Sequence, residues 1–255
     1  MKYFVPVLRF AQELPPQTAY QDKLGGIPWG LRSEDWPRCS DCGGSLSLLA
    51  QFAHHPERLD LGRPGRVLSI FQCNHHPGEC KTWAGGHGAN ACFVTEPEDL
   101  SPGLTAVPAD APFIETEVQV VEWADQDDGL TLEEHRCFFD DATMPDDDDL
   151  MDKLEEKITP DTRLGGTPFW VQSSYEAPEE DWRFVGQLDY IYRLHAAPSP
   201  EVAKQILGGV SEAFEAANGQ THICPSPNFG DAGIGYVFLR KTEGTPEGWF
   251  FWQCY

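Results

Sequence analysis

Four cysteines in the first third of the chain constrain its folding more than any other feature. Cys39 and Cys42 are separated by two residues, and Cys73 and Cys80 form a second pair further along the chain. Two glycines follow Cys42, as in a tight turn that presents two thiols to one side. Two thiolates from such a turn and two from a distant segment can complete a tetrahedral zinc site. The spacing therefore predicts a structural zinc centre that ties two remote segments together.

A zinc ion with four thiolate ligands has no open coordination position, so it would stabilise the fold without catalysing a reaction. Free thiols or a redox pair are the alternatives, but no βαβ pattern of the thioredoxin type surrounds the first pair. His75 and His76 lie between the second pair and could replace one thiolate. The other cysteines are single and scattered, which favours buried free thiols; they are Cys92, Cys137, Cys224 and Cys254.

The charge of the chain limits the classes of partner. Its 255 residues carry 41 acidic and 18 basic side chains, which gives a formal net charge of −23 at pH 7. Nucleic acid binding needs a basic surface, and the sequence holds no basic cluster, so nucleic acid is not expected as a partner. A basic protein suits the acidic field, and solubility is the alternative explanation for the charge.

The sequence predicts neither a secretory signal nor a membrane segment. The apolar stretch at residues 1–9 is interrupted by Pro6 and Arg9, and no small-residue cleavage site follows it. No run approaches the roughly 20 apolar residues that span a bilayer. We therefore expect a cytoplasmic protein, in which reduced paired cysteines favour metal binding over disulfides. A disulfide-stapled secreted protein is the disfavoured alternative.

One seven-residue pattern occurs twice: a cation, Leu-Gly-Gly, any residue, Pro, and then an aromatic residue. It covers residues 23–29 and returns at residues 163–169. A strand-like run containing a glutamine follows each copy, at residues 46–52 and 182–188. The glycines would supply positive φ angles in a turn. The recurrence predicts an internal duplication, and a recurring turn type is the alternative.

Most apolar runs are short, rich in β-branched and aromatic residues, and bounded by Gly and Pro, which indicates strands. The predicted strands cover residues 45–53, 66–73, 90–95, 117–123, 182–190, 234–240 and 248–253. Two segments have apolar residues at helical spacing, 147–158 and 200–217. The aspartates at 146–149 favour a solvated helix start, because they lack the ligand spacing and the central glycine of a calcium loop.

Together these patterns predict an α+β, β-rich fold. Two duplicated β halves of antiparallel, barrel-like sheets would form one compact domain, residues 1–255, with a few packed helices. The first half, about 1–121, would contain the zinc knuckle, and the second half would cover about 150–255. The acidic stretch 122–149 would be a mobile connector between them.

The chain resembles the YwqG-like family of largely uncharacterised bacterial proteins. The resemblance rests on Leu24-Gly25-Gly26-Ile27-Pro28, Trp36-Pro37, Leu48-Leu49-Ala50-Gln51 and residues 229–235, and it spans roughly residues 23–255. It implies one compact β-rich domain made of two related halves, with helices packed on the outside. For some members of the family it also implies an immunity role, because their genes occur near toxin genes.

The cysteine-containing part also resembles the eukaryotic programmed cell death 2 family. There, too, a Leu-Gly-Gly-x-Pro turn is followed by Cys-x2-Cys, a Leu-rich strand with Gln, and a later cysteine pair. This second resemblance implies the role of a chaperone for a basic ribosomal protein.

The sequence favours a binding protein over an enzyme. Five histidines in the first third could indicate catalysis or a second metal; they are His54, His55, His75, His76 and His87. The four that form two adjacent pairs lie beside prolines, as exposed loop residues often do. No Gly-x-Ser-x-Gly elbow or nucleotide loop is present. We therefore expect a non-enzymatic, zinc-stabilised module whose acidic surface recognises a basic protein, as a chaperone or an immunity factor. The alternative is an enzyme or small-molecule binder with a pocket between the two halves.

Overall fold

The computed structural model describes residues 1–255 except 111, 113, 115, 140–147, 179–180, 195–198, 200–212, 216–220 and 224–226. Its strands are β1 (Lys2–Phe10), β2 (Lys23–Leu24), β3 (Ser47–Ala53), β4 (Val67–Gln72), β5 (Asn90–Thr95), β6 (Val118–Asp127), β7 (Arg163–Gly165), β8 (Trp182–Asp189), β9 (Tyr192–Leu194), β10 (Ala213–Glu215), β11 (Thr221–Ile223), β12 (Ile234–Arg240) and β13 (Glu247–Gln253). The α-helices of this part are α1 (Leu132–Cys137) and α2 (Asp148–Glu155). Short 3-10 helices cover Ala11–Glu13, Ser33–Asp35, Pro97–Asp99 and Ser174–Glu176.

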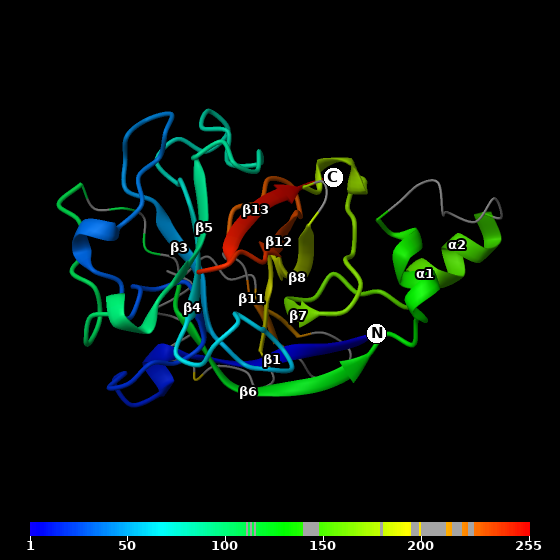
Figure 1. The fold of residues 1–255 in the computed structure, drawn as a ribbon, viewed down its shortest axis with the longest axis horizontal. Coiled ribbons are helices and arrows are strands. Elements are labelled where there is room, and N and C mark those ends of the chain that lie inside the picture. Colours follow the sequence, from blue (N-terminus) through cyan, green and yellow to red (C-terminus); the bar gives the residue numbers. More distant parts are fainter. Residues whose placement is uncertain are drawn as a thin grey trace.

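Ten of the described strands close into an antiparallel β-barrel (Figure 1). Around the barrel the order is β1-β6-β2-β3-β4-β5-β13-β12-β8-β7. The ring closes where β7 returns to β1, with Tyr3 opposite Gly165 and Phe4 opposite Leu164. Closure leaves the strands of the ring without free sheet edges, except where two neighbours separate along their length.

Three further strands extend from the barrel at β1. Strand β9 pairs with β1 in parallel at a single position, Leu8 opposite Leu194. Strand β11 pairs with β9, and β10 pairs with β11. In Figure 1, α1 and α2 lie together at one end of the molecule, away from β3, β4 and β5.

Several barrel strands are buried on both faces, which explains their nearly continuous apolar sequences. Every residue of β4 is buried, and so are six of the seven residues of β3 and of β12. Inside the barrel lies one apolar cluster that includes Phe52, Leu68, Val237 and Phe250. Outside it, separate clusters cover the β3–β4 face and the β12–β13 face. The outer cluster on β3 and β4 contains three of the four cysteines, so the candidate metal site is part of a core.

The two Leu-Gly-Gly turns are built alike. Each cation stands opposite a glutamine of the next strand, Lys23 opposite Gln51 and Arg163 opposite Gln187. Each cation donates to a carbonyl four residues further on, Ile27 and Thr167 respectively.

The glutamines complete the same arrangement in both turns. The Oε1 atom of Gln51 accepts the N–H of Trp29, and that of Gln187 accepts the N–H of Phe169, both at 2.9 Å. Both glycines have positive φ in each turn, 64° and 72° in the first and 80° and 72° in the second. Glycine adopts this backbone without strain, as the sequence predicts.

The β-rich part of the predicted fold is confirmed, and the described residues do not establish the α+β class. All seven predicted strands are present, as is the helix predicted over 147–158, which forms α2. The helix predicted over 200–217 is wrong at residues 213–215, which form β10, and its other residues lie outside the described residues. The predicted connector begins inside β6, because residues 122–127 pair with β1 and are held in the sheet.

Candidate metal centre

The thiols of Cys39, Cys42, Cys73 and Cys80 converge as the sequence predicts. Their Sγ atoms all lie within 4.8 Å of one another, and those of Cys42 and Cys73 are 3.6 Å apart. Zinc–sulfur bonds of about 2.3 Å give a tetrahedron with edges of roughly 3.8 Å. None of the four thiols is in a disulfide. The separations therefore fit a single tetrahedral metal ion held by four sulfur atoms.

The first pair is presented by a tight turn before β3. The backbone N–H of Cys39 donates to the carbonyl of Gly44 at 2.8 Å, and the N–H of Gly43 donates to the carbonyl of Cys39 at 2.9 Å. Gly43 has a φ of 74°, a conformation that residues with a Cβ rarely adopt. The two glycines therefore allow the chain to reverse immediately after Cys42.

The second pair comes from the end of β4 and the loop that follows it. Cys73 directly follows β4, and its N–H donates to the carbonyl of Ala89 at 2.9 Å. Cys80 follows a turn in which its N–H donates to the carbonyl of His76 at 3.2 Å. The register of β4 between β3 and β5 therefore fixes the position of Cys73 relative to the first pair.

Hydrogen bonds other than those of the cysteines join the two loops. The carboxylate of Asp41 accepts the N–H of Lys81 at 2.8 Å. Ser40 bonds to the opposite loop twice, through its N–H to the carbonyl of Gly88 and through its hydroxyl to the carbonyl of His87. The geometry of the site is thus prearranged by the polypeptide. These supporting contacts could not be predicted from the sequence, since Ser40 and Asp41 are ordinary turn residues.

Three of the four thiols are shielded from solvent. Cys39, Cys73 and Cys80 are 1–3% exposed, whereas Cys42 is exposed. Burial raises the pKa of Cys73 to about 11, and burial together with the neighbouring thiols raises the pKa of Cys80 further. Burial also opposes ionisation of Cys42, but hydrogen bonds outweigh it and lower the pKa of that thiol. A bound cation would favour the thiolate form of all four.

Backbone amides donate to one sulfur of each pair. The N–H of Gly44 donates to Sγ of Cys42, and the N–H of His75 donates to Sγ of Cys73. In both cases the donor lies two residues after the cysteine. Such bonds stabilise negative charge on sulfur and orient the ligand atom, as outer hydrogen bonds do in metal sites.

Histidine does not contribute to this centre. Within the described part of the chain, the converging group of metal-binding side chains consists of the four cysteines. His75 instead places Nε2 3.0 Å from the carbonyl oxygen of Ser45, and His87 places Nε2 3.1 Å from the carboxylate of Asp41. His54 accepts a backbone hydrogen bond from Leu61. The remaining two act in turns: Nδ1 of His55 accepts from residues 57 and 58, and His76 is exposed.

The remaining cysteines lie apart from the centre. Cys137 is buried as predicted, while Cys92 and Cys254 are partly exposed, and Cys224 lies outside the described residues. Burial raises the pKa of Cys92 well above the usual thiol value. A thiol in that state is a poor nucleophile at neutral pH.

Substitution of Gly44 by alanine is expected to destabilise the centre more than substitution of Gly43. A Cβ on Gly44 would lie 2.4 Å from Cδ2 of His75, whose ring is held by the carbonyl of Ser45. A Cβ on Gly43 meets nothing within 4 Å, so the cost there is backbone strain of about 1–2 kcal/mol. We expect Gly44→Ala to cost about 2–3 kcal/mol through overpacking. Urea denaturation of both variants measures the difference, and equal midpoints would contradict the role of the His75 contact.

Comparisons of the chain with protein-family models, curated proteins and solved structures gave no match. Among the described residues, no helix is long and apolar enough to cross a bilayer. The interpretation of the four-cysteine centre therefore depends on its own geometry and chemistry.

Proposed function

We propose that this protein is a non-catalytic binding module, stabilised by one structural zinc ion, that recognises a basic protein through its acidic surface. The observation that carries the proposal is the largely buried set of four thiols that lies where β3 begins and β4 ends. Soft sulfur ligands in a tetrahedral arrangement suit Zn²⁺, and four of them leave no position for a substrate. Zinc would then stabilise the β3–β4–β5 end of the barrel.

An internal duplication is part of this proposal. Its support is the matching construction of the two Leu-Gly-Gly turns, down to the cation, the carbonyl and the glutamine. Starting from the β5–β13 pair, the strands follow the order β5-β4-β3-β2-β6 in one direction around the barrel and β13-β12-β8-β7-β1 in the other. Strands at the same step of these two series would be equivalent. In this arrangement β1 and β6 are equivalent, and each pairs with the short strand of the other half, β1 with β7 and β6 with β2. We also propose that the chain belongs to the YwqG-like family and is related to the programmed cell death 2 family.

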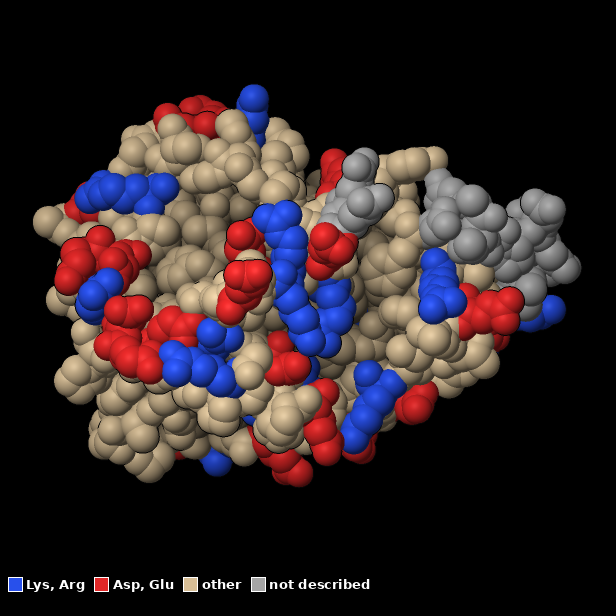
Figure 2. Space-filling view, in the orientation of Figure 1, with Lys and Arg blue, Asp and Glu red and all other residues tan. Residues whose placement is uncertain are grey.

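The charge distribution supports a basic partner. Most described Lys and Arg side chains already form ion pairs within the protein, so few positive charges remain to offset the excess of Asp and Glu. The paired residues are Lys2, Lys23, Arg32, Arg38, Arg58, Arg63, Arg66, Lys157, Arg193 and Arg240. On the face in Figure 2, basic side chains lie directly beside acidic ones. A field of this sign accelerates association with a cationic partner and repels nucleic acid. The proposed compartment is the cytoplasm, where the four thiols would remain reduced.

The proposal is tested by immobilising the zinc-loaded protein and passing over it a lysate of its own source organism at low and at high salt. One stoichiometric basic protein that is released at high salt is the expected result. Absence of a specific partner at either salt concentration would contradict a protein-binding function.

Charge reversal of the acidic stretch 122–149 is expected to weaken the complex with that partner. Asp146→Lys together with Asp147→Lys should lower the affinity at least tenfold at low salt and flatten its salt dependence. Fluorescence anisotropy at several salt concentrations measures both effects. The matched control, Asp231→Lys with Glu243→Lys, changes the net charge equally at two exposed residues outside that stretch. If both double variants behave alike, the stretch has no specific part in recognition.

A small-molecule function is favoured by one observation. A cavity of about 580 Å³ lies between segments of both halves, with Asp60, Gly62 and Arg66 on one side and Asp181, Arg183 and Lys241 among the residues on the other. Its size is that of a ligand site. Its described lining contains no histidine. Thermal stabilisation by an added metabolite, lost in Arg183→Gln, would favour this function.

A further inference from the structure

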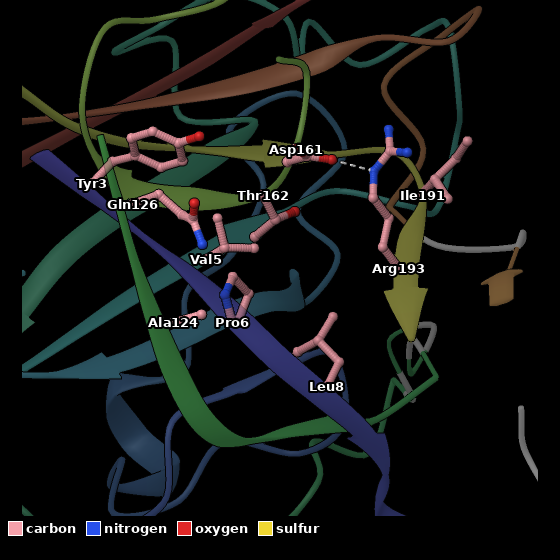
Figure 3. A pocket seen from close by; sticks show the side chains of 10 residues that line it. All are labelled: Tyr3, Val5, Pro6, Leu8, Ala124, Gln126, Asp161, Thr162, Ile191 and Arg193. Atoms are coloured by element: carbon pink, nitrogen blue, oxygen red, sulfur yellow. Dashed lines mark ion pairs between the residues drawn. The ribbon is translucent and has the colours of Figure 1, made fainter. Parts of the chain in front are cut away.

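The barrel wall opens beside β1. Strand β1 pairs with β7 at Tyr3 and Phe4, and on the same side it next pairs with β9 at Leu8. A cavity of about 230 Å³ lies where these neighbours separate (Figure 3). It is lined by Tyr3, Val5, Pro6, Leu8, Ala124, Gln126, Asp161, Thr162, Ile191 and Arg193.

The backbone of β1 is suited to this opening. The carbonyl of Lys2 accepts the N–H of Gly166, so the backbone N–H and C=O groups of Lys2 point toward β7. In a β-strand the N–H and C=O groups of every second residue point the same way. Pro6 is one of those residues, and it has no N–H to leave unsatisfied. The opening therefore needs no additional strand to complete the sheet. It is suited to a side chain or a small group rather than to an extended peptide.

An ion-pair cluster of two carboxylates and one guanidinium lies at the opening. One guanidinium, that of Arg193, lies between two carboxylates: its Nε is 2.5 Å from Asp161, and its Nη2 is 2.8 Å from Asp189. The side chain of Asp189 is 1% exposed, whereas that of Asp161 is 27% exposed and lines the cavity. Burial raises the pKa of Asp189 to about 6, against the opposing effect of Arg193. The lining itself carries one carboxylate, Asp161, and one guanidinium, Arg193, while Asp189 is buried behind Arg193 and the guanidinium of Arg163 lies 5.0 Å from the centroid of the Tyr3 ring. The carboxylate that an incoming cation can reach is therefore that of Asp161.

The remainder of the wall is mixed in character. Val5, Pro6, Leu8 and Ile191 supply apolar surface, and the ring of Tyr3 lies at the rim opposite Arg193 (Figure 3). Sites for drug-sized ligands have volumes of about 300–1,000 Å³, so this cavity matches something smaller. A lysine side chain combines an apolar stem with a compact cationic end.

We propose that this cavity, here called the β1 pocket, receives a lysine side chain of the basic partner, with the ammonium group at Asp161 and the methylene stem against Val5, Leu8 and Ile191. The inference rests on the proposed function, because it names the contact through which a basic protein would be recognised. Recognition of one inserted side chain would supply specificity that a general acidic field cannot give.

The test uses the full zinc-loaded chain, labelled with ¹⁵N, and a capped peptide, acetyl-Gly-Ser-Gly-Lys-Gly-Ser-Gly-amide. A second peptide with norleucine in place of lysine keeps the stem and removes the charge. The lysine peptide is expected to shift the amide signals of Ala124, Gln126 and Ile191, and the norleucine peptide to bind at least tenfold more weakly. Equal binding of the two peptides would overturn the proposal.

Two variants locate the interaction. Asp161→Asn retains the shape of the pocket and leaves Arg193 paired with Asp189, and it is expected to weaken lysine-peptide binding about tenfold, the effect of one charge-assisted hydrogen bond. Asp231→Asn makes the same charge change at a distant exposed site and should alter binding less than twofold. Ala124→Leu fills the pocket without changing charge and should also weaken binding. If Asp161→Asn and Asp231→Asn have the same effect, or if Ala124→Leu has none while its spectrum remains that of a folded protein, the pocket is not the site.

The outcomes separate this inference from the proposed function. A captured basic protein whose affinity is unchanged by Asp161→Asn and Ala124→Leu would overturn the inference and leave the proposed function standing. Pocket-specific binding of the lysine peptide, in a protein that captures no basic partner, would support the pocket chemistry while refuting the protein-binding function.

Discussion

Replacement of Cys73 by serine is expected to abolish binding of zinc and to lower the stability of the protein by about 5 kcal/mol or more, because the free energy of a structural metal contributes directly to folding. For a chain of this size, 1 kcal/mol corresponds to a Tm change of about 2–4 °C, so the midpoint should fall by at least roughly 10 °C. Elemental analysis of the purified protein should find one zinc per chain in the natural protein and none in the variant. Cys73 is the suitable position because it is 1% exposed and directly follows β4.

Cys254→Ser is the matched control for this substitution. Cys254 is a partly exposed free thiol outside the four-cysteine set. It should retain zinc and lose little stability. A natural protein without metal, or a Cys73→Ser variant with an unchanged midpoint, would contradict a structural zinc centre.

Metal removal should also be visible in tryptophan fluorescence. The loop that begins at Cys80 packs on β13, where a Cβ on Gly85 would lie 2.2 Å from Nε1 of Trp249. The backbone N–H of Trp252 donates to the carbonyl of Trp83 in the same loop, at 3.4 Å. Chelation should therefore change the emission of these indoles together with the loss of zinc, and Cys73→Ser should resemble the chelated protein.

Replacement of Gln187 by leucine is expected to cost about 3–5 kcal/mol, since several buried polar groups lose their partner at once. Gln187 is completely buried. Its Oε1 atom accepts from the N–H of Phe169, and its Nε2 atom donates to the carbonyls of Thr159 and Asp161, at 3.2 and 3.1 Å. Leucine has a similar volume but no polar atom, so the loss would report hydrogen bonding rather than a cavity.

The equivalent substitution in the other turn, Gln51→Leu, should have an effect of the same kind. Gln51 bonds both the N–H and the carbonyl of Trp29. Gln21 is exposed, and Gln21→Leu serves as the control that should be nearly neutral. Chemical denaturation compares the three variants. If Gln187→Leu is as mild as the control, the glutamine is not a structural element of the turn.

The strands and the cysteine site were predictable for different reasons. Strands such as β4 and β12 are buried on both faces, and their apolar runs are bounded by glycine and proline, so a local pattern identifies them. The four cysteines were recognisable because metal ligation needs particular side chains at particular spacing. β1 was not among the predicted strands, because it contains Pro6. The structure tolerates Pro6 there because β7 and β9 separate at that position.

Other features had no local signal. The predicted connector overlaps β6, whose polar second half is held in the sheet by pairing with β1 rather than by its own propensity. The β1 pocket joins Tyr3, Gln126, Asp161 and Arg193, which lie far apart in the sequence. No spacing rule brings such residues together.

The local chemistry follows from the order of the amino acids alone: the thiol pairs, the positive-φ glycine turns and the alternation of apolar runs with breaks. These features depend on side-chain type and on backbone conformations within a few residues. The folded chain was needed to establish which strands are neighbours, that the ring closes between β1 and β7, and where its wall opens. Those outcomes depend on hydrogen bonds and burial between segments distant in the chain, because a strand's partner is selected by the whole sheet rather than by the strand's own residues.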